Sequence, residues 1–176
     1  MVNHPVLDIS AHVPDQQAAA EKMMYMLFTA LGGSKGIGGA GQLKEIFCYE
    51  QAIIDNEIAG YVKHLIKGLT IDDESLAVDL IVEQGPGGNF IDADHTLKHM
   101  RECFHQPGNT FYRRRMSEWL EGDGKTALER AHQRVQQILA SEPKRYLTPE
   151  QEETMDEVIE RARQEFAPNW KPNWDE

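Results

Sequence analysis

The sequence predicts a mostly α-helical chain with at most one or two short strands. Apolar residues recur three or four positions apart over several long segments, and this spacing places them on one face of an α-helix. Such segments outnumber the strand-like runs throughout the chain. With 176 residues, of which 40% are apolar, the chain is long enough to bury a core in one or two units.

Charge and cysteine content exclude some partners and favour a reducing compartment. The net charge of −11 argues against a nucleic acid or an anionic membrane as a partner, because both would repel the chain. No apolar run reaches the length of a membrane-spanning helix, and residues 1–14 lack the pattern of a signal peptide. Cys48 and Cys103 are far apart in the sequence, which is typical of free thiols. We therefore expect a cytoplasmic protein.

The first expected elements are a short strand and a long helix. Residues 6–9 favour the strand. The helix is expected over 16–31, after Pro14 and before Gly32 and Gly33. Its apolar positions recur at helical spacing and comprise Ala20, Met23, Met24, Leu27, Ala30 and Leu31. The methionines favour core packing over the lining of a pocket, because methionine fills irregular gaps in cores.

A glycine-rich stretch over 34–41 superficially resembles the phosphate-binding turn of short-chain dehydrogenases. In that turn a strand enters and a helix leaves towards the pyrophosphate, whereas here a helix enters. No tyrosine of the chain is followed four residues later by the lysine that those enzymes require. We therefore interpret the stretch as a loop and a short strand at 35–41, in a crowded place where small residues let a backbone or a ligand approach.

A second long helix is expected over 47–69. Its apolar face comprises Ile54, Ile58, Val62, Leu65 and Leu69. Tyr49, Glu50 and Gln51 lie at the start of this helix, directly after the predicted strand, and the carboxyl end of a strand carries ligands in strand–helix architectures. The alternative is that Glu50 is a favourable acid in the first helical turn and Tyr49 a packing aromatic.

A helix over 72–83, a glycine-rich loop and a further helix are expected next. The loop glycines can adopt positive φ and give the loop a specified shape; they are Gly85, Gly87 and Gly88. Asp92 or Asp94 can cap the following helix. That helix has an apolar face of Leu97, Met100, Cys103 and Phe104 and a polar face of His95, Lys98, His99 and Glu102. The alternative to a functional loop is a simple corner between helices with a solvated polar face.

The remainder of the chain is also expected to be helical. Residues 111–115 place two aromatics beside three arginines, and in a chain this acidic we interpret the arginines as partners of its own carboxylates. A short helix around Trp119 and a longer one over 128–139 follow. The sequence Thr-Pro-Glu-Gln at 148–151 is a capping box that starts a last helix. The tail, 168–176, is expected to lie along a surface groove.

Four separated stretches carry a resemblance to a known family. They are His12-Val-Pro-Asp-Gln-Gln-Ala-Ala-Ala-Glu-Lys22, Gly39-Ala-Gly41, Tyr49-Glu-Gln-Ala-Ile-Ile-Asp-Asn-Glu57, and Gly85-Pro-Gly-Gly through His95-Thr-Leu-Lys-His-Met-Arg101. In this order they closely resemble the C-terminal part of the corrinoid-dependent trimethylamine methyltransferase family, which includes glycine betaine methyltransferases that lack pyrrolysine. Several ordered motifs make this resemblance more specific than any single glycine loop.

The resemblance implies an α/β fold for the family, a (β/α)8 TIM-type barrel, of which this mostly helical chain would hold the C-terminal portion plus the C-terminal helices. Residues 1–84 would form the last βα units of a partial barrel, and residues 85–176 the glycine loop and the C-terminal helical region. Members of the family that this chain resembles transfer a methyl group from a methylated amine to a cobalt corrinoid. The resemblance thus implies a methyltransferase, or a fragment of one, whose cobalamin-type corrinoid is carried by a partner corrinoid protein and is not bound tightly by this chain.

The resemblance also implies a substrate and site residues. Pyrrolysine falls near the segment that matches 12–14, where this chain has ordinary residues, so the expected substrate is a quaternary amine such as a betaine. A quaternary ammonium has no proton to lose, and its activation needs positioning and contacts with carboxylates or aromatic faces. The expected catalytic residues are Glu50 and His12, the substrate-binding residues are Tyr49, Gln51 and Val13, the loop or structural residues are Gly85, Gly87, Gly88 and His95, and no residue is assigned to a metal.

Two other functions remain as hypotheses at this point. The chain can be a non-catalytic truncated fragment or assembly subunit that needs another chain, or an unrelated oxidoreductase that binds NAD. A homo-oligomer is also expected, because a short glycine-rich strand leaves unpaired edges and the helices over 16–31 and 49–69 carry broad apolar faces.

Overall fold

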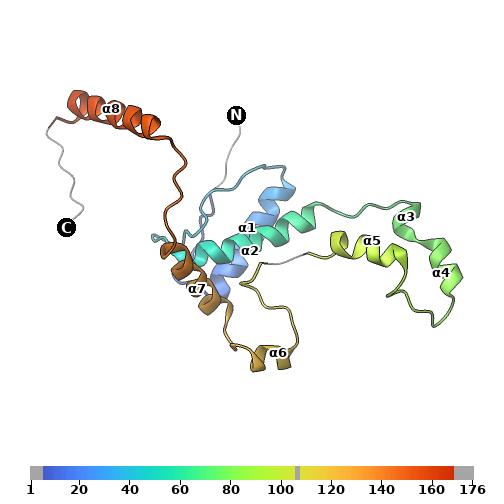
Figure 1. The fold of residues 1–176 in the computed structure, drawn as a ribbon. Coiled ribbons are helices and arrows are strands. Elements are labelled where there is room, and N and C mark those ends of the chain that lie inside the picture. The colour runs from blue at the N-terminus through green and yellow to red at the C-terminus, as the bar shows by residue number, and fades with distance from the viewer. Residues whose placement is uncertain (1–5, 106–107, 169–176) are drawn as a thin grey trace. The chain divides into compact units, whose positions relative to one another are not determined.

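The computed structural model describes residues 6–105 and 108–168 and divides the chain into two units, one up to Leu139 and one from Ala140 onwards (Figure 1). The helices of the first unit are α1 (Gln16–Leu31), α2 (Tyr49–Ile66), α3 (Asp73–Leu76), α4 (Val78–Gln84), α5 (Asp94–Cys103), α6 (Met116–Glu121) and α7 (Ala127–Leu139). The second unit contains α8 (Pro149–Phe166). The expectation of a mostly helical chain is confirmed.

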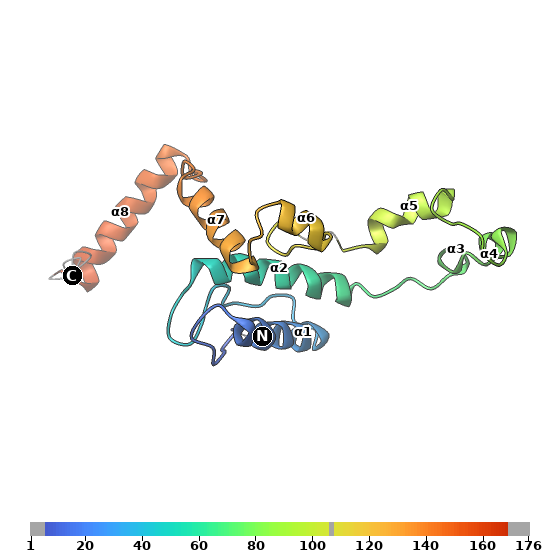
Figure 2. The same ribbon diagram turned by 90° about the horizontal axis from the view of Figure 1, so that it is seen from below.

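The core of the first unit lies where α1, α2 and α7 pack together. Helices α1 and α2 lie side by side, and α7 packs on α2, as Figures 1 and 2 show. The main core cluster consists of Leu7, Met26, Ile54, Ile58, Val62 and Ala131. A second cluster joins the N-terminal segment to α1 and to the loop before α2, and consists of Ile9, Ala11, Ala18 and Leu43. Of the apolar face predicted for α2, Ile54, Ile58 and Val62 pack in the core, whereas Leu65 and Leu69 are 55% and 90% exposed, so the prediction was right for the first three residues and wrong for the last two.

A buried ion pair joins both long helices to the glycine-rich loop. Nζ of Lys22 on α1 lies 2.5 Å from Oδ2 of Asp55 on α2, and the two side chains are 0% and 1% exposed. Lys22 also donates to the backbone oxygen of Gly39 at 3.1 Å. Asp55 accepts two further hydrogen bonds, from the backbone N–H of Gly41 and the side-chain amide of Gln51, both at 2.7 Å. These partners offset the cost of burying both charges.

The glycine-rich stretch at 35–41 does not form the predicted strand. Its contact with the N-terminal segment is a single parallel bridge between Val6 and Gly38. Gly39 and Gly41 have φ values of +89° and +80°, and positive φ interrupts an extended backbone. The prediction of a strand here was therefore wrong, and the part of the described chain around it has isolated bridges in place of a sheet.

The same stretch is nevertheless as crowded as its small residues indicate. A Cβ atom on Gly41 would lie 2.6 Å from a ring carbon of Phe47 and 3.0 Å from the Cβ of Ala52. A side chain larger than hydrogen would push this loop away from the start of α2. The interpretation that small residues permit a close approach is confirmed, and the approaching groups belong to the chain itself.

Helix starts agree with the sequence at two positions. Asp15 caps α1, and its carboxylate accepts hydrogen bonds from the backbone N–H groups of Gln17 and Ala18 at 2.9 and 3.2 Å. The capping box predicted at the start of α8 is present, with reciprocal hydrogen bonds between Thr148 and Gln151. Both arrangements satisfy backbone donors that a helix cannot pair internally.

Two local predictions were wrong. The helix expected over 72–83 is divided into α3 and α4 by Ala77, whose φ of +48° is left-handed and cannot continue a right-handed helix. Helix α5 has Ala93 at its N-cap position without a side-chain hydrogen bond, so neither Asp92 nor Asp94 caps it.

The described residues contain no helix long and apolar enough to cross a membrane. Apart from Pro168, the tail expected to lie along a groove falls outside the described residues. The described residues also contain no extended strand, so the barrel remains a prediction, as does the expected division of the chain at residue 84.

Replacing Lys22 with methionine should lower the free energy of unfolding by about 3–5 kcal/mol, because the Asp55 carboxylate would stay buried without its cation. Urea denaturation followed by far-UV circular dichroism measures the change. Lys44→Met is the matched control, because its Nζ lies 3.9 Å from Asp8 in an exposed pair, and its loss should cost less than about 1 kcal/mol.

The double variant Lys22→Met with Asp55→Asn should recover part of the loss, because it leaves no unpaired buried charge while the asparagine still accepts from Gly41. Equal destabilisation by Lys22→Met and Lys44→Met would show that the buried pair is not needed for the packing of α1 on α2.

Candidate functional site

An acid–imidazole pair lies at the start of α2. Oε1 of Glu50, in the first turn of α2, is 2.8 Å from Nδ1 of His132 on α7. Ala131 and Val135 are 0% and 6% exposed and anchor α7 in the core, which brings His132 to Glu50. The Glu50 and His132 side chains are 23% and 58% exposed, so the pair is accessible from solvent.

The surroundings of Glu50 favour its ionised form. The hydrogen bond with His132 lowers the pKa of Glu50 most, its own backbone N–H and the Cys48 thiol lower it further, and burial opposes them. A position in the first turn of a helix also favours a carboxylate. Burial raises the pKa of the Cys48 thiol, and the nearby Glu50 carboxylate adds to this effect. At neutral pH Glu50 is therefore an anion, and Cys48 is a thiol and not a nucleophilic thiolate.

A small open cavity of about 510 Å³ lies beside this pair. Its lining consists of Glu50, Lys125, Leu128, Glu129, His132 and Gln133. Two carboxylates and one ammonium line it, and the ammonium of Lys125 lies 3.6 Å from Asp123. The carboxylates of Glu50 and Glu129 are both left without this ammonium as a partner; Glu50 is held by His132, and Glu129 accepts hydrogen bonds from Thr126. A concave site lined mainly by polar side chains, with more carboxylates than ammonium groups, suits a small cation.

Tyr49 and Gln51, expected to bind substrate, are not among the residues that line this cavity. The Tyr49 side chain is 59% exposed and contacts Phe47 edge to face, with ring centroids 5.2 Å apart. Gln51 is 1% exposed, and its amide donates to Asp55. The structure thus places Gln51 in the buried polar cluster of the fold. Substrate-binding roles for both residues stay predictions.

His12 and Val13 lie on the segment before α1, and both are exposed, Val13 by 56%. Within the described ranges, no hydrogen bond or ion pair joins His12 to Glu50. The structure therefore brings Glu50 together with His132, and not with the histidine chosen from the sequence. The catalytic role assigned to His12 stays a prediction.

The loop residues behave largely as their sequence indicates. Gly85 and Gly87 have φ values of +63° and +81°, which confirms positive φ at these two positions. Gly88 does not have a positive φ, so the prediction was wrong there, but a Cβ at this position would lie 2.6 Å from the backbone oxygen of Gln84. Nε2 of His95 lies 2.7 Å from the backbone oxygen of Glu74, so this histidine ties α5 to α3.

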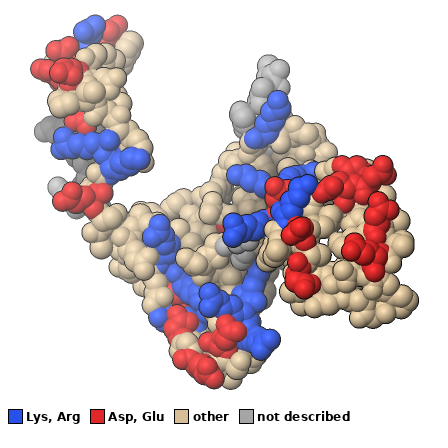
Figure 3. All heavy atoms as spheres, turned by 45° about the vertical axis from the view of Figure 1, so that its right-hand side comes forward, with Lys and Arg blue, Asp and Glu red and all other residues tan. Residues whose placement is uncertain are grey.

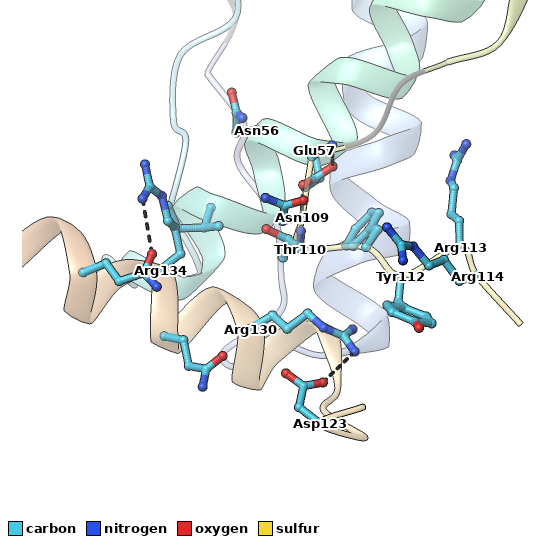
Figure 4. A pocket seen from close by; sticks show the side chains of 15 residues that line it. Asn56, Glu57, Asn109, Thr110, Tyr112, Arg113, Arg114, Asp123, Arg130 and Arg134 are labelled. Atoms are coloured by element: carbon cyan, nitrogen blue, oxygen red, sulfur yellow. Dashed lines mark hydrogen bonds and ion pairs between the residues drawn. The ribbon is translucent and has the colours of Figure 1, made fainter. Parts of the chain in front are cut away.

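A larger polar groove of about 1140 Å³ lies between α2, α7 and the segment at 108–114 (Figure 4). At its base, the Glu57 carboxylate is 5% exposed and accepts hydrogen bonds from the backbone N–H groups of Gly108 and Thr110 at 2.9 and 3.0 Å. In Figure 4, Arg130 reaches from α7 towards Asp123, to which it donates at 3.3 Å. Glu57 therefore fastens the segment after α5 to α2.

The arginines at 113–115 were expected to pair with the chain's carboxylates, and this is confirmed for Arg114, which lies 3.9 Å from Glu118. Arg113 instead donates to the Tyr61 hydroxyl at 2.9 Å, and its guanidinium lies 4.4 Å from the centre of that ring. These contacts fix two of the cations that line the groove. We therefore regard it mainly as a structural junction.

Sequence reasoning missed His132, Lys22 and Asp55. Lys22 carried a signal, because it is spaced four residues from Ala18 and Met26 on an apolar helix face, and Asp55 stands beside Ile54 on another. Opposite charges on the apolar faces of two helices predict an ion pair between those helices. His132 carried no such signal, because it is 82 residues from Glu50 and lies on an exposed helix face.

The helical first unit presents an ionised carboxylate, Glu50, beside a small cavity. This arrangement is suited to binding a small cation. The family model for trimethylamine methyltransferase (MTTB) matches residues 8–167 of this chain. The chain belongs to the trimethylamine methyltransferase family, as the resemblance in its sequence indicated.

Individual relatives agree with this assignment. Trimethylamine methyltransferase MttB of Desulfitobacterium hafniense (strain DSM 10664 / DCB-2) is 35% identical over 90% of this chain and 32% of its own length. MttB of Methanosarcina barkeri (strain Fusaro / DSM 804) is 33% identical over 89% of this chain and 32% of its own length. The glycine betaine methyltransferase of Desulfitobacterium hafniense (strain Y51) is 36% identical over 77% of this chain and 29% of its own length. The chain spans about a third of the length of these relatives.

The carboxyl of Glu50 should titrate below the ordinary glutamate pKa of about 4.3. His132→Gln should raise this pKa, because the hydrogen bond with His132 is the largest cause of its lowering. Carboxyl-detected NMR over pH 2–7 measures both values. A lowered pKa stabilises the fold above the unfolded value, so the contribution should be lost as pH falls through the folded pKa. His12→Gln is the control and should leave the titration unchanged; an unchanged titration in His132→Gln would contradict the pairing.

Proposed function

We propose that this chain forms the C-terminal part of a methyltransferase that binds a methylated or quaternary amine, such as a betaine, beside Glu50. The observation that carries the proposal is the ionised Glu50 carboxylate, held by His132 at the edge of a small open cavity. A fixed carboxylate attracts a quaternary ammonium, which cannot escape the interaction by losing a proton. The relative named glycine betaine methyltransferase supports the same substrate class.

The residues of the cavity would contribute both charge and shape to the binding of the amine. Glu50 would hold the cationic nitrogen, and His132 would keep the carboxylate in one orientation through its hydrogen bond. The apolar side chain of Leu128, which lines the cavity, can contact the methyl groups. When a methyl leaves, the nitrogen becomes neutral and its attraction to Glu50 weakens, which favours release of the product.

A cobalt corrinoid carried by a partner protein would supply the nucleophile that accepts the methyl group. The exposure of the Glu50 and His132 side chains, 23% and 58%, fits a cofactor that approaches from a separate protein. The role of this chain would then be to bind and orient the amine towards that cofactor. Family membership supports the corrinoid partner, and we propose the cytoplasm as the place of the reaction.

We further propose that the chain acts within a (β/α)8 barrel whose other units come from residues outside it. The chain matches only about a third of each relative, which supports this view. Apolar side chains on the surfaces of α1 and α2 also support it: Met24, Phe28, Leu31, Leu65 and Ile66 are 45–69% exposed. In a barrel such faces are covered by neighbouring units, whereas in the chain alone they are open to a second copy.

The isolated chain should self-associate through these apolar faces. The unpaired strand edges expected from the sequence no longer support association, because the strand is not formed. Size-exclusion chromatography with light scattering at micromolar concentrations should give a mass above 20.0 kDa, and Phe28→Glu should shift it towards the monomer. Glu83→Gln on α4 is a control for a surface change. A stable monomer for the parent chain would contradict the prediction.

The activity test mixes this chain with the complementary first part of the glycine betaine methyltransferase relative and supplies cob(I)alamin. We expect methyl transfer from glycine betaine, followed by the absorbance change of the corrinoid. Glu50→Gln should raise KM for the amine at least about tenfold, because loss of about 1.4 kcal/mol of ionic contact corresponds to that factor. Glu83→Gln should leave KM unchanged.

The outcomes separate the competing functions. Transfer from trimethylamine and not from glycine betaine would overturn the betaine assignment. A stable complex without methyl transfer would favour the non-catalytic assembly subunit. Equal KM values for the parent and Glu50→Gln would remove Glu50 from the amine site.

A further inference from the structure

A cluster of two imidazoles and one carboxylate lies outside the Glu50 cavity, between α3 and α5. His95 and His99 are one helical turn apart on α5, and Glu74 lies on α3. One potential ligand atom from each residue lies within 4.8 Å of the other two. The rings of His95 and His99 are 4.5 Å apart between centroids, so both imidazoles face the same place.

From this geometry we propose that Glu74, His95 and His99 bind a divalent transition-metal ion, with Zn²⁺ as the ion that fits best. Two imidazole nitrogens and one carboxylate oxygen form a three-ligand zinc set, and water or a ligand takes the fourth position. Tetrahedral bonds of about 2.0–2.1 Å place ligand atoms roughly 3.3 Å apart. The ligand atoms are at most 4.8 Å apart, so each pair would have to approach by no more than about 1.5 Å to reach that separation.

The existing contacts show that these groups already converge. Nε2 of His99 lies 3.2 Å from Oε1 of Glu74, and Nε2 of His95 lies 2.7 Å from the backbone oxygen of the same residue. The same ring nitrogen of each histidine is thus directed at Glu74. Binding of a cation would replace these two hydrogen bonds with metal–nitrogen bonds while keeping the direction of both rings.

The charge of this part of the chain favours a cation. Residues 72–102 carry eight carboxylates and only two basic side chains. Figure 3 shows acidic side chains gathered on the part of the surface that contains α3 to α5. Such an excess of negative charge raises the local concentration of divalent cations.

One neighbouring cation competes for the same carboxylate. Nζ of Lys98 lies 2.6 Å from Oε1 of Glu74, and the two side chains are 64% and 55% exposed. An exposed pair of this kind contributes little to stability, so a divalent ion can displace the ammonium. Removing the Lys98 charge should therefore strengthen metal binding, a result that a purely structural role of the cluster would not produce.

The metal ion would link the two ends of the loop at 85–93, because Glu74 precedes this loop in the sequence and His95 and His99 follow it. Gly85 and Gly87 have positive φ, and they allow the chain to return so that α5 reaches α3. Metal binding would then cross-link the two helices across this loop. Formation of the site does not depend on the proposed methyl transfer, because it shares no residue with the Glu50 cavity.

The test is a calorimetric titration of the full, tag-free chain with Zn²⁺ at pH 7.5. We expect one ion per chain, and His95→Ala and His99→Ala should each weaken binding at least about tenfold, the size typical of a lost ligand contact. Alanine maintains an exposed helix, and circular dichroism checks that α5 is retained. His12→Ala is the matched control, because His12 is an exposed histidine outside the cluster, and it should leave the affinity unchanged.

Two further measurements make the assignment specific. Lys98→Met should tighten Zn²⁺ binding roughly fivefold, because it removes a like charge within about 4 Å of the ion. Co²⁺ should give visible absorption bands of a four- or five-coordinate site that His95→Ala and His99→Ala abolish. Zn²⁺ affinity that is unchanged in both alanine variants, or a Co²⁺ spectrum identical to that of the hydrated ion, would overturn the proposal.

Discussion

The ion pair between Lys22 and Asp55 is the interaction on which the first unit depends. It joins α1 to α2, and through Gly39 and Gly41 it also fixes the loop that connects these two helices. If apolar side chains stood in its place, α1 and α2 could shift along each other at little cost. A buried charge pair with directed hydrogen bonds permits one arrangement, because any shift would leave a charge unpaired in a medium of low dielectric constant. The side chains around it, including Met26, Ile54 and Ile58, then pack in a single register.

The chemistry of the site follows from this arrangement. With α2 fixed, its first turn carries Glu50 at the surface, and α7, anchored by Ala131 and Val135, places His132 against it. The result is an anion whose lowered pKa keeps it charged at neutral pH beside a thiol that stays protonated. An ionised carboxylate beside a protonated thiol suits the binding of a cation, which is the role proposed for this site. This agrees with the proposal that a corrinoid on a partner protein accepts the methyl group.

The segment from α3 to α5 has a different physical character from the core. Its helices are short, its described side chains are mostly exposed or half-buried, and Ala77 interrupts what the apolar spacing predicts as one helix. Polar contacts between Glu74 and the α5 residues His95, Lys98 and His99 hold α3 and α5 together where apolar burial does not. Exposed polar contacts are weak individually, so this segment is more sensitive to ligands and ions than the core is.

The sequence by itself determined most of the helices, because apolar spacing and capping residues act over a few positions, but it did not show that Ala77 divides the helix expected over 72–83. It correctly placed α1, the start of α8, the positive φ of Gly85 and Gly87, and the family. It also indicated Glu50 as a functional acid, a role that remains to be tested. It misjudged the stretch at 35–41 and the cap of α5, because small residues and nearby aspartates are compatible with more than one local geometry.

Only the tertiary structure decided that Gln51 supports Asp55, that Glu57 holds the backbone at Gly108 and Thr110, and that Glu50 meets His132. These pairs are 4 to 82 residues apart, and the longer ones depend on how α2 packs against α7 and the 108–110 segment, which no local pattern specifies.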